Sequence, residues 1–191
     1  MTLMIVGLVI FLGIHSVSIV ALGWRDAQVA QRGEKAWKGI YSVISLLSFV
    51  LLIYGYSLAR QSPTVLYTPP TAMRHVALLL MLPVFPLLAA SSLPGRIKTA
   101  AKHPMLLAIK LWAVAHLLAN GTLHDTILFG SFLAWAVADR ISVKRRAVQR
   151  PVPGAAPSPM NDVKALVGGL AVYALFVFWA HGWLIGVSPL R

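Results

Sequence analysis

The stretch Lys102–Gly121, KHPMLLAIKLWAVAHLLANG, places a histidine, His116, on a mostly apolar run. Pro104 suits the first position of a helix, because a residue there has no helical acceptor for its N–H. The Asn120-Gly121 pair is typical of a helix C-terminus. The stretch therefore predicts a membrane helix that carries an imidazole where water has little access.

The rest of the chain shares this apolar character. Its 191 residues are 58% hydrophobic and only 12% charged, with a mean hydropathy of +0.76, whereas roughly a quarter of the residues in soluble domains are charged. Apolar runs of about 20 residues recur along the sequence, which is the length of one bilayer crossing. The expected fold class is all-α: a single polytopic transmembrane domain over residues 1–191.

Six apolar runs predict six transmembrane helices. They lie at about Thr2–Leu22, Gly39–Ala59, His75–Ser92, Pro104–Asn120, Thr126–Ile141 and Ala165–Val187. No basic residue precedes the first run, so it lacks the n-region of a signal peptide and is expected to stay in the mature protein. Pro83 and Pro86 predict a kink in the third helix, because each removes a backbone donor.

The connections between these helices differ in composition. Residues 23–38 and 93–103 are expected to be basic loops, and the second connection, with VLYTPP at residues 65–70, an ordered interfacial loop. Residues 142–160 are basic and rich in Pro and Ala, which predicts a flexible linker.

The basic residues are distributed unevenly. Of the 17 Lys and Arg residues, 13 lie in the first, third and fifth connections. The positive-inside rule then places both termini on the non-cytoplasmic side and the linker in the cytoplasm. The net charge of +12 thus reflects topology and contact with anionic lipid headgroups, above all at the basic linker, and no nucleic-acid partner is expected.

Several kinds of chemistry are excluded by composition. The chain has no cysteine, which rules out disulfides, iron-sulfur clusters and covalent c-type haem, and leaves histidine as the strong nitrogen ligand. All five carboxylates are expected at helix ends or in loops, which argues against an ion pump or a proton-coupled transporter. Phosphate-binding, nucleophile-elbow and zinc signatures are missing as well.

The histidines fall into two groups. Three lie at predicted helix ends, where interfacial placement is expected: His75, His103 and His124. His15, His116 and His181 lie deeper, and a buried imidazole costs free energy unless it is paired or ligating. Each of these three either bonds a nearby hydroxyl or carbonyl, or belongs to a pair that holds a haem iron from both faces.

The predicted depths of these histidines in the membrane are compatible with two alternative pairs of haem iron ligands. At ~1.5 Å per residue, His15 and His116 differ in depth by roughly 10 Å, whereas His181 lies nearer the level of His116. On position alone, His116 with His181 competes with His15 with His116.

The chain also resembles a known family in several segments. These are the HS pair at residues 15–16, GEKAWKGIYS at 33–42, VLYTPP at 65–70, PGRIK at 94–98, KHPM at 102–105, LWAVAHLLANG at 111–121 and FGSFLAWAVADR at 129–140. Together they resemble the NnrU family of bacterial membrane proteins over most of the chain, excluding the linker. The resemblance implies a multi-pass protein of the bacterial inner membrane linked to denitrification, with a respiratory or nitric oxide reductase complex as a partner.

The HS pair and the segment around His116 are similar, more distantly, to the proposed haem b ligand motifs of the plastid 15-cis-zeta-carotene isomerase. This resemblance implies that His15 and His116 are the axial ligands of a haem b iron, and it ranks this pair above His116 with His181. The isomerase's cysteine falls at Ala113, so ligand switching through sulfur is not expected and haem binding is favoured over carotene isomerisation.

A third resemblance concerns the KHP motif, which is similar to the RHP of membrane methyltransferases that bind S-adenosylmethionine. The Glu- and Tyr-bearing segment of those enzymes is replaced here by RRAVQRPVPG at residues 145–154, so methyl transfer is not expected. The expected function is haem-linked redox chemistry in nitrogen-oxide metabolism. The alternatives are a haem-dependent isomerase of a lipophilic, carotenoid-like substrate and a non-catalytic assembly factor for a respiratory enzyme.

Overall fold

Helices make up the regular structure. The computed structural model describes residues 1–146 and 154–190. In these residues the elements are α1 (Thr2–Val20), α2 (Leu22–Arg32), α3 (Glu34–Ala59), α4 (Thr71–Met81), α5 (Val84–Ser92), α6 (Arg96–Ala101), α7 (Pro104–Ala119), α8 (Leu123–Arg145), α9 (Met160–Leu175), the π-helix η1 (Phe176–Ala180) and α10 (His181–Ile185). The all-α fold class is confirmed.

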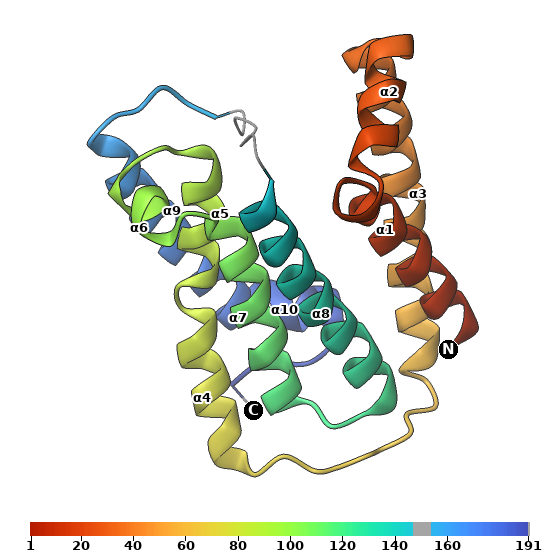
Figure 1. Cartoon of the computed structure of the whole chain (residues 1–191). Helices are drawn as coiled ribbons and strands as arrows, with labels where there is room; N and C mark the ends of the chain where they lie inside the picture. The colour runs from red at the N-terminus through yellow and green to blue at the C-terminus, as the bar shows by residue number, and fades with distance from the viewer. Residues whose placement is uncertain (147–153, 191) are drawn as a thin grey trace.

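Five helical rods of the described chain are long and apolar enough to cross a membrane: α1, α3, α4 with α5, α8, and α9 through α10. The apolar helix α7 has 16 residues, or about 24 Å at ~1.5 Å per residue, which is shorter than the ~30 Å hydrocarbon core. Six full crossings therefore stay a prediction. In Figure 1 successive rods run in opposite directions, and both termini lie at the same end of the bundle.

The segment predicted as the first loop is helical. α2 spans Leu22–Arg32, and α3 begins at Glu34 instead of Gly39. The intervening sequence contains good helix formers and no proline, so it continues as helix although it is too polar for the bilayer core. Gly33, with a positive φ of 82°, supplies the turn between α2 and α3.

Two glycines allow α1 and α3 to touch backbone to backbone. A Cβ at Gly7 would lie 2.5 Å from the backbone nitrogen of Leu52, and one at Gly55 would lie 2.2 Å from that of Met4. Small residues permit such close approach of membrane helices. This pair forms a hairpin at one side of the bundle, next to α8 (Figure 1).

The kink predicted at the third helix is confirmed as a break between α4 and α5 at Leu82 and Pro83. α4 starts at Thr71, four residues before the predicted start, because Pro70 stands directly before the first turn. α5 then packs on α9, where a Cβ at Gly169 would lie 2.4 Å from the backbone nitrogen of Pro86.

The linker predicted at residues 142–160 is shorter in the structure. α8 continues to Arg145, and Arg146 pairs with Asp139 at 3.1 Å and bonds the Ser18 carbonyl on α1 at 3.1 Å. These contacts explain why the helix runs on past Ile141. The flexibility predicted for residues 147–153 lies outside the described residues.

The segment after residue 153 is docked against the loop that precedes α6. The Ala155 N–H donates to the Ser92 carbonyl at 2.9 Å, and the buried Asn161 side chain donates to the Pro94 carbonyl at 2.8 Å. Asp162 accepts from the N–H groups of Arg96 and Ile97 at 2.9 and 3.0 Å. A carboxylate from α9 thus satisfies orphan donors at the start of α6.

The last predicted helix, Ala165–Val187, consists of three pieces. α9 begins five residues earlier, at Met160, and passes into the π-helix η1 and then α10. Gly186, with a positive φ of 76°, ends α10. A π-helical turn changes the direction in which side chains point, and such turns are frequent at functional sites.

Apolar side chains cover both the inside and the outside of the bundle. Met4, Leu8 and Phe129 belong to a buried cluster between α1, α3, α7 and α8. On the outside Leu47 is 65% exposed and Leu79 is 70% exposed. Contact with lipid accounts for exposed apolar surface of this extent, which monomeric soluble proteins rarely show.

Candidate functional site

His116 lies on α7, three residues before the helix ends. Its Nδ1 is 2.8 Å from the carbonyl oxygen of Trp112, one turn earlier. A carbonyl only accepts, so Nδ1 carries a proton. The ring stacks on Phe129 of α8 with centroids 4.5 Å apart. The orientation of the His116 ring is thus fixed, and among the described residues no hydrogen-bond partner occupies its Nε2.

His181 is held in the same way at the start of α10. Its Nδ1 is 2.6 Å from the carbonyl oxygen of Val187, which follows the turn at Gly186. The same reasoning places a proton on Nδ1, and among the described residues Nε2 has no hydrogen-bond partner. The π-helical turn directly before His181 sets the direction from which this imidazole enters the interior.

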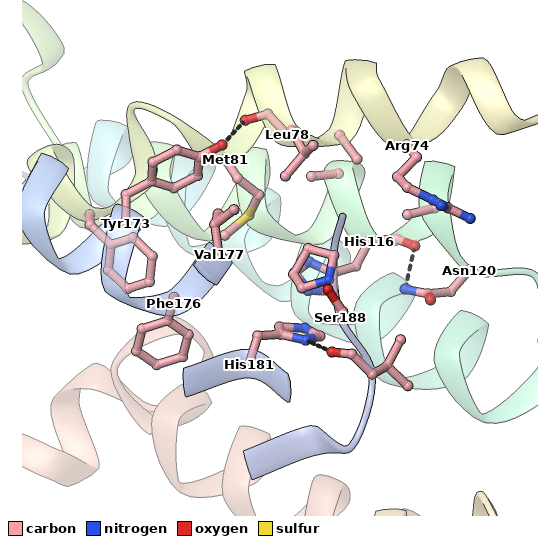
Figure 2. Close-up of a pocket in the computed structure, with 16 residues that line it drawn as sticks. Arg74, Leu78, Met81, His116, Asn120, Tyr173, Phe176, Val177, His181 and Ser188 are labelled. Atoms are coloured by element: carbon pink, nitrogen blue, oxygen red, sulfur yellow. Dashed lines mark hydrogen bonds between the residues drawn. The ribbon is translucent and has the colours of Figure 1, made fainter. Parts of the chain in front are cut away.

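The two imidazoles line one pocket between α4, α5, α7 and the C-terminal segment (Figure 2). Its volume is about 190 Å³, and it is partly open. The lining residues are Arg74, Ala77, Leu78, Met81, Phe85, Ala115, His116, Ala119, Asn120, Tyr173, Phe176, Val177, His181, Val187, Ser188 and Pro189. Most of this surface is apolar, so its few polar groups decide what it can bind.

The polar groups are not spread evenly. Figure 2 shows Arg74 and Asn120 at one end of the pocket, the two imidazoles and Ser188 in the middle, and Tyr173 and Phe176 at the other end. No carboxylate side chain is among the described residues that line the pocket. Since arginine stays protonated in proteins, the pocket is positively charged at the Arg74 end and apolar at the opposite end.

The end of α7 beside this pocket is secured by the second connection. The Tyr67 hydroxyl contacts the carbonyl of Leu117, and it donates to that of Asn120 at 2.7 Å. The Leu66 N–H donates to the Gly121 carbonyl at 2.8 Å. These contacts satisfy carbonyls that lack helical partners. The VLYTPP segment is therefore ordered, as predicted, and it fixes the helix turn that carries His116.

His15 lies elsewhere, on α1 near α8. Its Nδ1 is 2.7 Å from the carbonyl oxygen of Phe11, so this nitrogen carries a proton as in the other two histidines. The ring stacks on Phe11 at 4.2 Å and meets the edge of Trp135 at 6.1 Å. His15 does not line the pocket of His116 and His181.

Aromatic side chains form a continuous path between His15 and His116. Phe11, which stacks on His15, is 5.8 Å from Phe132 by ring centroids, Phe132 is 5.4 Å from Trp112, and Trp112 is 5.4 Å from His116. The structure thus brings His116 together with His181 and does not bring it together with His15. His15 and His116 as the axial pair stay a prediction.

A second polar cluster, which the sequence did not suggest, lies where α8 begins. The Tyr56 hydroxyl of α3 donates to Asp125 at 2.6 Å, and the Thr122 hydroxyl donates to its other oxygen at 2.7 Å. His124 Nε2 lies 3.1 Å from the Thr122 hydroxyl, and its Nδ1 is buried without a partner among the described residues. His124 and Asp125 are 3% and 5% exposed. The cluster joins α3 to α8.

His124 lies in the first turn of α8, a helix end as predicted, but its side chain is buried within the protein. α8 starts at Leu123 instead of Thr126, with Thr122 as its N-cap, so the next residues turn inward against α3. The Thr-x-x-Asp spacing of residues 122–125 is a helix-start signature that would have revealed this. His75 is exposed and His103 is half-buried before the start of α7, and their interfacial placement stays a prediction.

Other residues of the pocket had no sequence signal. Arg74 was used only to predict topology, Tyr173 belonged to a helix expected to be continuous, and Ser188 follows the predicted end of that helix at Val187. Within the described residues no group of three or more His, Asp or Glu side chains is placed to hold a metal ion. The pocket therefore offers a pair of imidazoles rather than a chelating cluster.

Comparison with known proteins gives one family. The family model described as NnrU protein matches residues 3–189. The match includes all the segments that form the pocket and the cluster at the start of α8. Searches of curated proteins and of solved structures gave no match.

Proposed function

The chain belongs to the NnrU protein family, and from this premise we propose that it is a multi-pass membrane protein that binds haem b in the pocket lined by His116 and His181. We propose further that it acts in nitrogen-oxide-linked redox metabolism of the bacterial inner membrane. The observation that carries the haem proposal is the pair of imidazoles, each with its proton fixed on Nδ1 and its Nε2 free of described partners, on one apolar pocket.

The residues present fit such a group. Neutral imidazole is the ligand type of b-type haem, and the bond from Nδ1 to a backbone carbonyl orients a ligating histidine and raises its basicity. The volume of about 190 Å³ is below the ~300 to 1,000 Å³ of typical ligand sites. A porphyrin is larger than this space, so part of it would lie outside the pocket.

The chain's own residues would hold and shield the group. His116 is fixed by Trp112 and Phe129, and His181 by the turn that carries Val187. The walls are mostly apolar, which suits the apolar porphyrin ring. When bound between two such ligands, a haem supplies one-electron transfer.

The spectrum of the purified protein tests this proposal. Full-length chain is produced with a haem precursor, purified in detergent and recorded in oxidised and reduced forms, together with His116→Ala, His181→Ala and His15→Ala. His75→Ala, at an exposed histidine, is the matched control. We expect a low-spin b-type spectrum that both pocket substitutions abolish or turn high-spin, whereas His15→Ala and His75→Ala leave it unchanged.

Two other results would contradict the proposal in different ways. Loss of the low-spin spectrum in His15→Ala, with His181→Ala unaffected, would assign the ligands to His15 and His116 and remove the role of this pocket. A wild-type protein that is colourless and takes up no added haem would refute haem binding and favour the assembly factor. The metabolic role is tested by nitric oxide consumption in a deletion strain complemented with wild type or His116→Ala.

A further inference from the structure

Arg74 is the charged group of the pocket that the haem proposal leaves without a role. It lies in the first turns of α4 and is half-buried, and no described residue pairs with it. We infer that the pocket takes an amphiphile bearing a carboxylate, with Arg74 as the residue that pairs with this carboxylate. The inference deepens the proposed function and rests on it for the use of the pocket as a ligand site.

The charge balance of the pocket supports an anionic ligand. Arginine stays protonated, and no Asp or Glu is among the described residues that line the pocket. A partly buried cation without a counter-ion is unfavourable. A carboxylate satisfies it best, because the planar guanidinium matches carboxylate geometry with two parallel hydrogen bonds.

The backbone around Arg74 adds to this preference. Arg74 is the fourth residue of α4, an eleven-residue helix. Although the Met73 N–H already donates to the Pro70 carbonyl at 2.9 Å, the helix dipole gives this end a partial positive charge. A negative group beside Arg74 is therefore favoured by both the side chain and the helix end.

The far end of the pocket supports the amphiphilic character of the ligand. Met81, Phe176 and Val177 lie at the end opposite Arg74 in Figure 2, with the two imidazoles in between. Apolar side chains there favour a hydrocarbon group. The arrangement from charged end through imidazoles to apolar end would accommodate haem b, whose carboxylates lie along one edge, and equally a free fatty acid.

Comparing the binding of an acid with that of its ester tests whether the carboxylate contributes to affinity. Binding of haem b and of its dimethyl ester is measured by absorption titration of the apoprotein in detergent, for wild type, Arg74→Gln and the charge-conserving Arg74→Lys. Hydrogen bonds to charged groups predict that wild type binds the acid about tenfold to a hundredfold more tightly than the ester. Arg74→Gln should bind both alike, and Arg74→Lys should restore part of the preference.

A second experiment tests this inference independently of the haem proposal. Oleate and methyl oleate are compared for the rise they cause in thermal midpoint, which needs no haem. A preference for oleate that Arg74→Gln abolishes supports the inference even if neither porphyrin binds, in which case only the haem proposal fails. Equal effects of acid and ester in both experiments, or a preference that survives in Arg74→Gln, would overturn the inference. Since Arg74 has no described partner, Arg74→Gln should unfold at the wild-type midpoint.

Discussion

Replacing Tyr56 by Phe removes one hydroxyl from the buried contact between α3 and α8 and leaves the ring in place. The ring's edge contact with His124, with centroids 5.4 Å apart, is kept. Only the bond from the Tyr56 hydroxyl to Asp125 is lost. The substitution therefore isolates one hydrogen bond between two membrane helices.

The size of the effect follows from the geometry. The oxygens are 2.6 Å apart, which is the range of a charge-assisted O–H···O⁻ bond, and Asp125 is 5% exposed, so water cannot replace the lost donor. Hydrogen bonds to charged groups contribute about 1.5–3 kcal/mol, whereas side-chain bonds between membrane helices reach at most about 1.7 kcal/mol in measured cycles. The two ranges overlap near about 1.5 kcal/mol, which is the coupling energy we expect.

The assay is a double-mutant cycle. Free energies of unfolding are measured by denaturation in mixed detergent micelles for wild type, Tyr56→Phe, Asp125→Asn and the double variant. Tyr54→Phe, at a hydroxyl on the same helix whose residue is 57% exposed, is the control and should change stability by less than about 0.5 kcal/mol. A coupling energy between Tyr56 and Asp125 below about 0.5 kcal/mol would refute the buried contact.

Three further predictions concern packing and pH. Gly55→Ala should lower the free energy of unfolding by about 1–3 kcal/mol, because its Cβ would lie 2.2 Å from the α1 backbone. Gly13→Ala, where the added Cβ has open space around it, is the control and should leave the unfolding midpoint unchanged or raise it slightly. Gly121→Ala would place a Cβ 1.8 Å from the Tyr67 carbonyl oxygen, so it should detach the second connection and raise proteolytic cleavage there, and an unchanged cleavage pattern would contradict the close approach. Burial lowers the pKa of His103 below its ordinary value of 6.5, so the unfolded state binds the proton more tightly and stability should fall as the pH drops through 6.5. Because the ring is only half-buried the fall should be small; it should be reduced in His103→Gln, and identical pH profiles would show that the shift is absent.

The helical membrane bundle was predictable from the sequence because lipid forces the backbone to satisfy its own hydrogen bonds. Apolar runs of bilayer length therefore form helices, and the positions of prolines indicate where these helices start or break. This reasoning placed the start of α7 at Pro104 and the break beside Pro83 correctly. The sequence was sufficient to predict a helix boundary where a nearby proline causes it.

Helix ends were predicted less well, because hydropathy measures preference for lipid and not helix formation. α2 is polar and yet helical, and α8 extends beyond its apolar run at both ends. At its start the Thr122 cap and the Tyr56 contact draw polar residues inward. The Thr122 cap is a local pattern, whereas the Tyr56–Asp125 contact joins residues that are 69 positions apart in the sequence and leaves no pattern within either segment.

The sequence by itself determined which residue types are available for chemistry: histidines in an apolar, cysteine-free chain, and the segments that mark the NnrU family. Only the tertiary structure decided which histidines meet. A periodic pattern fixes the depth and face of a side chain on its own helix but not which helix lies opposite. The π-helical turn that aims His181 toward His116, and the aromatic rings that lie between His116 and His15, arise from packing between helices.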